Sequence, residues 1–294
     1  MKATISLLML VCLCSLTACV QDMSGNHNHS DAAGTASPDT NVSQEWAKAR
    51  LAKSPRHQEW VKVKNGTREV SSFVVYPENK NKATAVIVIH EIFGMSDWVQ
   101  SLADQLAEAG YVAIAPDLLS GMGPNGGGTS SMTGDAIGKA IRDLPPDQIT
   151  GDLNAVADYI SKVPASNGKI VVTGYCWGGG QSFRYATNNP NLKAAFVFYG
   201  PAPASADGAP DKAALAKITA PVYGFYAGND ARINATLPKT TEAMTELKKK
   251  YEPVTYDGAG HGFMRAGEAP DANEANKKAR DDAWARWKKL LAGI

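Results

Sequence analysis

The sequence predicts a single α/β domain with a mostly parallel central sheet and helices on both of its faces. Short apolar runs alternate with helical patterns along most of the chain, and this alternation is typical of parallel sheets. The run Ala85–Ile89 is unbroken and aliphatic, as expected of a strand buried on both faces. Hydrophobic residues make up 44% and charged residues 20% of the 294, which are ordinary values for a globular protein.

The elements before the middle of the chain follow from local signals. Residues 45–55 have a helical pattern, and residues 58–77 are predicted to form two strands around the Asn65-Gly66 turn. Ser96 is placed to cap a helix that ends at Gly110. Its apolar side chains recur at helical spacing: Trp98, Leu102 and Leu106.

The same alternation continues to the end of the chain. Two more helices are predicted from apolar stripes, formed by Leu153, Val156, Ala157 and Ile160, and by Trp284, Trp287 and Leu291. Further strands are predicted at Tyr111–Ala115, Ile170–Thr173, Ala195–Tyr199, Val222–Tyr226 and Pro253–Tyr256. In such sheets the chemistry gathers at the carboxyl ends of the strands, so the residues that follow each strand are the candidates for a site.

The N-terminal residues match a bacterial lipoprotein signal. Lys2 is followed by the apolar core Ile5–Leu13, which is too short to span a bilayer. Leu16-Thr17-Ala18-Cys19 then resembles a lipobox, so we expect residues 1–18 to be removed and Cys19 to be lipidated. The alternative is an ordinary signal peptide cut nearby. Val20 after Cys19 favours the outer membrane, and the expected location is the cell envelope, facing the periplasm.

Residues 19–43 are predicted to be a flexible tether, and residues 44–294 the α/β domain. The tether is polar and nearly free of aliphatic side chains, so it cannot bury a core. Lys and Arg number 30 and Asp and Glu 29, and this balance gives no electrostatic case for binding nucleic acid. We expect a monomer with a small-molecule substrate.

Cys176 is the candidate nucleophile. After the strand Ile170–Thr173 comes Gly174-Tyr175-Cys176-Trp177-Gly178, the G-x-S-x-G elbow pattern with Cys in place of Ser. The turn from strand to helix is tight, so neighbouring side chains must be small. The dipole of the following helix is expected to favour the thiolate. The alternative is a buried structural cysteine beside a glycine-rich turn.

Asp230 and His261 are the candidate acid and base. Asp230 directly follows the strand Val222–Tyr226, and His261 lies in a glycine-rich loop after the last predicted strand. Cys176, Asp230 and His261 stand in the nucleophile–acid–histidine order of α/β-hydrolases. Taken singly, Asp230 could be a turn-forming residue and His261 an ordinary loop histidine.

Four motifs together resemble the dienelactone hydrolase family: HEIFG at 90–94, GYCWGG at 174–179, GND at 228–230 and AGHGFMR at 259–265. The resemblance covers residues 58–294 and implies an α/β-hydrolase fold, hydrolysis of a small ester or lactone, and no metal or organic cofactor. It places a Cys-His-Asp triad on Cys176, His261 and Asp230, and an additional carboxylate on Glu91. It also implies that the backbone N–H groups of Ile92 and Trp177 form an oxyanion hole, and that Arg265 binds a substrate carboxylate.

Glu91 also has a physical argument of its own. A carboxylate at the end of a buried strand is costly unless it is paired. It can form a purely structural ion pair with Arg265, or it can take a proton from Cys176. A second arginine, which the family uses upstream, has no clear counterpart here; Arg142 could serve, and the glycine-rich residues 120–135 suggest a differently shaped pocket.

Two other functions remain open from the sequence. The chain could be a catalytically silent, surface-tethered binding lipoprotein on a hydrolase scaffold, because a fold does not determine a function. Redox sensing at Cys176 is disfavoured, because there is no resolving cysteine beside it.

Overall fold

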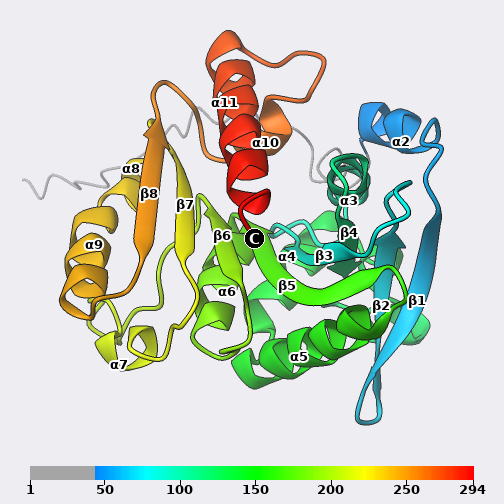
Figure 1. Ribbon diagram of the computed structural model, residues 1–294, viewed down its shortest axis with the longest axis horizontal. Coiled ribbons are helices and arrows are strands. Elements are labelled where there is room, and N and C mark those ends of the chain that lie inside the picture. Colours follow the sequence, from blue (N-terminus) through cyan, green and yellow to red (C-terminus); the bar gives the residue numbers. More distant parts are fainter. Residues whose placement is uncertain (1–43) are drawn as a thin grey trace, which may run out of the picture. The chain divides into compact units, whose positions relative to one another are not determined.

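An eight-stranded sheet runs through residues 44–294, the part of the chain that the computed structural model describes (Figure 1). The predicted signal peptide (1–18), the lipidation at Cys19 and the tether up to residue 43 lie outside the described residues, and they stay predictions. In the described part, no helix has both the length and the apolar character that crossing a membrane requires.

The sheet is mostly parallel, as predicted. Its strand order is β1-β2-β4-β3-β5-β6-β7-β8, and the last six strands in this order are parallel neighbours. β1 and β2 form an antiparallel hairpin around Gly66, and β2 pairs antiparallel with β4. The strands span Gln58–Asn65, Arg68–Val75, Ala83–Ile89, Val112–Pro116, Ser166–Tyr175, Ala194–Phe198, Val222–Ala227 and Tyr251–Tyr256, from β1 to β8.

Helices cover both faces of the sheet, which confirms the predicted layering (Figure 1). One face carries α2 (Glu45–Leu51), α3 (Asp97–Glu108), α10 (Phe263–Ala266) and α11 (Glu274–Leu291). The other face carries α4 (Gly134–Asp143), α5 (Pro146–Lys162), α6 (Trp177–Ala186), α7 (Lys212–Leu215), α8 (Ala231–Asn234) and α9 (Leu237–Glu246).

Strand β3 lies between the two hydrophobic cores. Ala85, Ile87 and Ile89 point into the core under α5 and α6, whereas Val86 and Val88 point into the core under α3 and α11. All five side chains are inaccessible to solvent. Burial of a Val or Ile side chain stabilises a fold by about 1.5–3 kcal/mol. The unbroken aliphatic run therefore anchors the strand whose end carries His90 and Glu91.

Two ten-residue helices, α4 and α9, were not predicted, and neither were the four-residue helices α7, α8 and α10. Only Thr240, Ala243 and Met244 are buried on α9, so its apolar stripe is too short to stand out in the sequence. Helix α4 follows the glycine-rich segment, which contains two short 3-10 turns at Pro124–Gly126 and Thr129–Ser131. The predicted cap of α3 is confirmed, because the Ser96 hydroxyl accepts a hydrogen bond from the Val99 N–H at 3.4 Å.

The carboxyl ends of the parallel strands gather the residues that carry chemistry. Glu91 follows β3 closely, Cys176 follows β5 directly, and Asp230 follows β7. His261 lies in the loop between β8 and α10. The topology therefore brings these four positions to one edge of the sheet.

Candidate active site

Cys176 sits in a strained turn between β5 and α6. Its φ and ψ angles are 55° and −117°, a backbone conformation that non-glycine residues rarely adopt and that costs about 1–3 kcal/mol. The surrounding packing fixes this turn. A Cβ atom on Gly174 would lie 1.9 Å from the Gly178 carbonyl oxygen, and one on Gly178 would lie 2.3 Å from the His90 carbonyl oxygen. The predicted need for small residues on both sides of Cys176 is thus confirmed.

The backbone N–H groups of Trp177 and Ile92 both act on the Cys176 sulfur as donors, and each lowers the pKa of its thiol. These are the two donors expected to form the oxyanion hole. They come from different segments, the first turn of α6 and the loop after β3, so the tight packing of Gly178 against the end of β3 brings them together. In this arrangement the sulfur occupies the hydrogen-bonding position that a developing oxyanion would need.

The thiol is protonated at neutral pH. Burial, together with the negative charge of Glu91, raises the pKa of the Cys176 thiol to about 11. The two N–H donors and the charge of Arg232 act in the opposite direction and are weaker. The N–H at the start of α6 does favour the thiolate, as expected for the helix terminus, but burial and Glu91 outweigh it and the resting group is the thiol. For Cys176 to act as a nucleophile, as predicted, a base has to remove this proton first.

His261 and Asp230 form a close pair. The Asp230 Oδ2 atom lies 2.5 Å from His261 Nδ1, and Asp230 Oδ1 accepts a hydrogen bond from the Ile233 N–H at the start of α8. The Asp230 side chain is 7% exposed and the His261 side chain 33%. A carboxylate at Nδ1 places the ring proton there and leaves Nε2 with a free lone pair, which suits a general base.

No hydrogen bond joins the Cys176 sulfur to the His261 ring within residues 44–294, where the sulfur is held by the two backbone donors instead. The three predicted triad residues therefore lie at the same end of the sheet without forming a continuous hydrogen-bonded chain. The Cys-His-Asp triad stays a prediction.

Glu91 forms a buried ion pair with Arg265. The Arg265 Nε atom donates to Glu91 Oε2 at 2.7 Å, and the Glu91 side chain is 3% exposed. The guanidinium also lies over the Phe93 ring, with 5.0 Å between its carbon and the ring centroid. Glu91 thus takes part in two interactions: it is neutralised by Arg265, and its charge raises the pKa of the Cys176 thiol. The ion pair with Arg265 is thus present, and proton transfer from Cys176 to Glu91 stays a prediction.

Two residues near the site were missed from the sequence. Tyr199 directly follows β6 and has a φ of 40°. Its ring meets the His261 ring edge-on at 5.1 Å, and its buried hydroxyl has no hydrogen-bond partner. Arg232 is exposed on α8 and forms no ion pair within the described range. Both residues come soon after the end of a strand, and this position was the signal that could have indicated them from the sequence. Arg142, the candidate second arginine, is exposed on α4.

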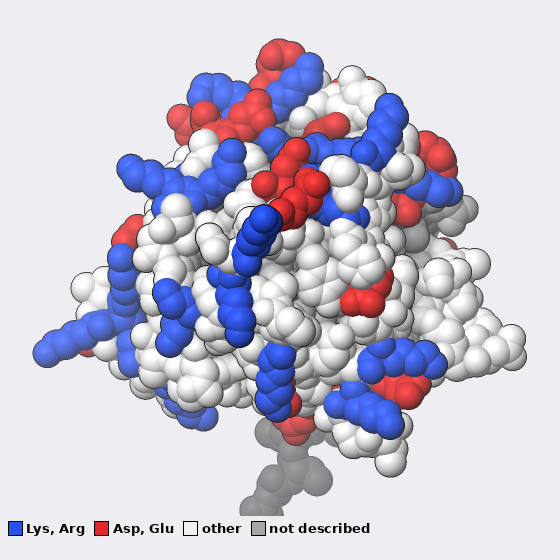
Figure 2. All heavy atoms as spheres, turned by 45° about the vertical axis from the view of Figure 1, so that its right-hand side comes forward, with Lys and Arg blue, Asp and Glu red and all other residues white. Residues whose placement is uncertain are grey.

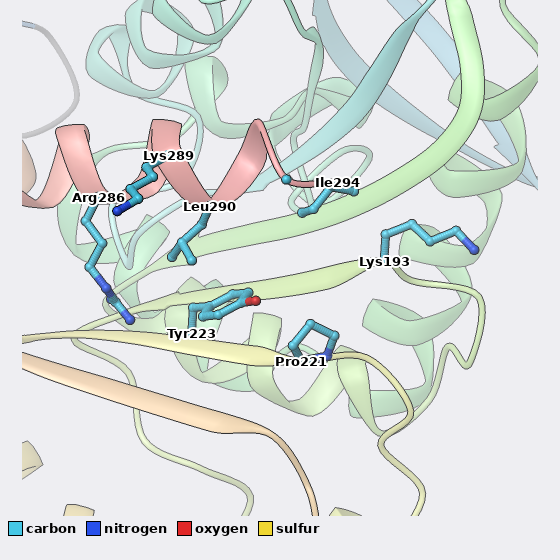
Figure 3. Close-up of a pocket in the computed structure, with 8 residues that line it drawn as sticks. Lys193, Pro221, Tyr223, Arg286, Lys289, Leu290 and Ile294 are labelled. Carbon is cyan, nitrogen blue, oxygen red and sulfur yellow. The ribbon is translucent and has the colours of Figure 1, made fainter.

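Away from this site, the described surface carries mixed charges and a groove at the opposite edge of the sheet. Within residues 44–294, no group of three or more His, Cys, Asp or Glu side chains is placed to hold a metal ion. Figure 2 shows basic and acidic side chains interspersed over the face it displays. A groove of about 580 Å³ lies at the amino ends of β6 and β7, opposite the candidate site (Figure 3). Its lining includes Lys193, Tyr223, Arg286 and Lys289.

The dienelactone hydrolase family model matches residues 70–294. The chain belongs to the dienelactone hydrolase family. A relative from Saccharolobus solfataricus, provisionally named carboxymethylenebutenolidase, is 32% identical over 258 residues, which cover 77% of this chain and 95% of the relative. A relative with the same provisional name from Salmonella typhi is 34% identical over 205 residues, covering 68% of this chain and 74% of the relative.

The solved structures agree with this family. A crystal structure from Klebsiella pneumoniae, provisionally described as a dienelactone hydrolase, superposes with a TM-score of 0.70 and 27% identity, covering 81% of this chain and 99% of that one. The predicted α/β-hydrolase fold is thereby confirmed, and so is the prediction that the chain is a carboxylic ester hydrolase. A small-molecule ester substrate follows from membership of the dienelactone hydrolase family.

The Glu91→Gln substitution is expected to make the Cys176 thiol more reactive. It removes the negative charge that helps to raise the pKa of the thiol, so the pKa falls below about 11. Each unit by which it falls increases the thiolate fraction at pH 8 about tenfold. The measurement is the rate of alkylation by iodoacetamide at pH 8.

A matched control for this experiment is Glu268→Gln. Glu268 is also a buried glutamate paired with an arginine, with Glu268 Oε1 2.8 Å from Arg280 Nη2, but it does not act on the thiol. Its substitution should leave the alkylation rate unchanged. An unchanged or slower rate in Glu91→Gln would contradict the electrostatic account of the thiol.

Proposed function

We propose that this chain hydrolyses a small carboxylic ester or lactone through a thioester on Cys176, with His261 as general base and Asp230 as its orienting acid. The observation that carries this proposal is the seating of the Cys176 sulfur on two convergent backbone N–H donors. The Cys176 sulfur lies at the same ends of the strands as the His261–Asp230 pair. Nucleophile, base, acid and oxyanion donors are the components that acyl transfer requires.

The resting thiol has to be activated by the substrate. Its pKa of about 11 keeps the sulfur protonated, and the sulfur itself holds the N–H groups of Ile92 and Trp177. When a substrate carbonyl oxygen takes these two donors, the sulfur is displaced from them. Its proton passes either to His261 or to Glu91. The chain thereby avoids carrying an exposed, oxidisable thiolate before a substrate is bound.

Substrate recognition is proposed to act through Arg265. Its guanidinium is already paired with Glu91, so a substrate carboxylate that binds Arg265 competes with that glutamate for its charge. The displaced Glu91 carboxylate would then be an unpaired buried charge, and such a charge gains strongly from taking up a proton. This competition favours transfer of the thiol proton to Glu91 when an anionic substrate is present.

The covalent steps need no reactant other than the ester and water. The sulfur forms a bond to the acyl carbon, the carbonyl oxygen becomes an oxyanion held by Ile92 and Trp177, and the acyl C–O bond breaks. The leaving alkoxide or enolate takes the proton that the base received. Water, deprotonated by His261, attacks the thioester, releasing the carboxylic acid and restoring the thiol. Asp230 stabilises the imidazolium in each step in which His261 holds the proton.

Cys176→Ala is expected to reduce hydrolysis of an activated ester, or of cis-dienelactone, to the rate without enzyme. Alanine adopts the strained φ of 55° no less readily than cysteine, so the fold is retained. The measurement is initial rate against substrate concentration, with circular dichroism to verify folding. Undiminished turnover by the alanine variant would overturn the proposed function.

Arg265→Ala is expected to abolish a preference for substrates that carry a free carboxylate. A hydrogen bond between charged groups contributes about 1.5–3 kcal/mol, which corresponds to a loss of about 10- to 150-fold in kcat/KM. The measurement compares lactones and esters with and without a carboxylate. Arg142→Ala, on the exposed surface of α4, is the control; a larger loss in that variant would assign carboxylate binding to Arg142 instead.

We also propose that the protein is anchored to the bacterial outer membrane, facing the periplasm, through a lipid on Cys19. The support is the sequence alone: Lys2, the apolar core Ile5–Leu13 and Leu16-Thr17-Ala18-Cys19 follow each other as in lipoprotein signals. Two or more acyl chains on one residue anchor a protein stably, whereas a single chain binds only marginally.

Cys19→Ala is expected to abolish lipid attachment. In a bacterial host, the unsubstituted chain should incorporate an alkynyl fatty acid and enter the detergent phase of a Triton X-114 separation, whereas the variant should do neither. Cys14→Ala is the matched control, because Cys14 lies within the predicted signal peptide. Labelling of the Cys19→Ala variant equal to that of the control would exclude this anchor.

A further inference from the structure

His90 is a buried histidine that the proposed reaction does not use. It follows β3 directly, and its side chain is inaccessible to solvent. Its Nδ1 atom lies 2.9 Å from the Glu91 carbonyl oxygen, and its Nε2 atom lies 3.3 Å from the Leu118 backbone nitrogen. A carbonyl accepts and an N–H donates, so Nδ1 carries the proton and Nε2 accepts. Both ring nitrogens are occupied, and His90 has no free lone pair with which to act as a base.

The carbonyl that His90 holds belongs to the peptide that provides an oxyanion donor. The Glu91 C=O and the Ile92 N–H are parts of one planar trans peptide, so they point in opposite directions. The Ile92 N–H donates to the Cys176 sulfur. A hydrogen bond that fixes the carbonyl end of this peptide also fixes the direction of its N–H. The Gly94 N–H donates to the same carbonyl at 3.1 Å, which leaves this oxygen with two partners.

The ring of His90 also contacts the residue that provides the second donor. The His90 and Trp177 rings are stacked, with 5.6 Å between their centroids and 15° between their planes. The backbone of Gly178, next to Trp177 in the chain, lies so close to the His90 carbonyl that no Cβ atom would fit. His90 is therefore linked to both oxyanion donors, to one through its peptide and to the other through its ring and backbone.

The partner of Nε2 is held in place by a polar network. The Asp117 carboxylate accepts hydrogen bonds from the Thr129 N–H at 2.8 Å and from the Thr129 hydroxyl at 2.7 Å. The Thr129 hydroxyl in turn accepts one from the Met95 N–H at 3.1 Å. These bonds connect the segment after β4, which includes Leu118, to the loop that carries Ile92. Burial lowers the pKa of His90, which agrees with a neutral ring between two backbone groups.

We propose that His90 is a positioning residue that directs the Ile92 and Trp177 N–H groups into the oxyanion hole; this inference rests on the proposed thioester mechanism. Its Nδ1–H sets the orientation of the Glu91–Ile92 peptide, and its stacked ring holds Trp177. In this role His90 never exchanges a proton with the substrate. Its contribution is to hold the two donors in place before the oxyanion develops.

Two substitutions separate this role from general stabilisation of the fold. In His90→Asn, the side-chain amide nitrogen can take the place of Nδ1 and donate to the Glu91 carbonyl. In His90→Gln, the amide reaches the place of Nε2, where its oxygen can accept from the Leu118 N–H, but the bond to the Glu91 carbonyl is lost. Each variant keeps one of the two hydrogen bonds, so each is a control for the other.

The expected result is a difference in kcat between the two variants. Complete loss of one oxyanion donor costs about 100- to 1000-fold in rate, so misdirecting one is expected to lower kcat by about 10- to 100-fold in His90→Gln. Both variants lose the ring that stacks on Trp177, so a loss of kcat shared by both reports on that contact, whereas the further loss in His90→Gln reports on the hydrogen bond to the Glu91 carbonyl. KM should change little in either variant. A small aldehyde inhibitor forms a hemithioacetal with Cys176, and the oxygen of this adduct occupies the oxyanion hole. The affinity for this inhibitor should fall in parallel with kcat.

Equal kcat values for His90→Asn and His90→Gln, at equal melting temperatures, would overturn the positioning role. So would a loss of kcat that follows the melting temperature of the variants and leaves aldehyde affinity unchanged. Cys176→Ala measured alongside separates this outcome from failure of the proposed function. If that variant is inactive while the His90 pair is equal, only the positioning role fails; if it retains full turnover, the thioester mechanism fails as well.

Discussion

The strained backbone of Cys176 is the constraint on which the candidate site depends. Its positive φ persists because the turn is packed on three sides by backbone, with no room for a Cβ atom at Gly174, Gly178 or Gly179. The same close approach brings the loop after β3 against the start of α6, so that Ile92 and Trp177 direct their N–H groups at one sulfur. Strain in this turn and convergence of the donors are thus two consequences of one packing arrangement.

In the proposed mechanism, the electrostatics of the site make activation of the Cys176 thiol dependent on the substrate. Burial and Glu91 keep the Cys176 thiol protonated, while Arg265 keeps Glu91 neutralised. In the proposed mechanism, an anionic substrate disturbs this balance at Arg265 and supplies a base at the sulfur in the same event. Buried ion pairs often contribute little to stability. In the proposed mechanism, the Glu91–Arg265 pair has a role in catalysis instead.

The sequence predicted the layering and most strands because unbroken runs such as Ala85–Ile89 and stripes such as Trp284, Trp287 and Leu291 are strong signals of burial. It also placed the candidate residues Glu91, Cys176 and Asp230 after strand ends, where the structure has them; their roles stay predictions. It could not indicate the resting position of the sulfur or its raised pKa, which depend on burial and on the distance to Glu91. Tyr199 and Arg232 were missed because a lone tyrosine or arginine carries no pattern, and α9 because its buried stripe is short.

The most direct test of the central claim is to identify the acyl-enzyme itself. The enzyme is mixed with excess activated ester, quenched in acid during turnover, digested with trypsin and analysed by mass spectrometry. Cleavage after Lys169 and Arg184 gives one peptide that contains Cys176. The account predicts the added acyl mass on that cysteine, removable by hydroxylamine and absent from the alanine variant. Turnover with the acyl group on another residue, or on none under conditions where its hydrolysis is rate-limiting, would contradict it.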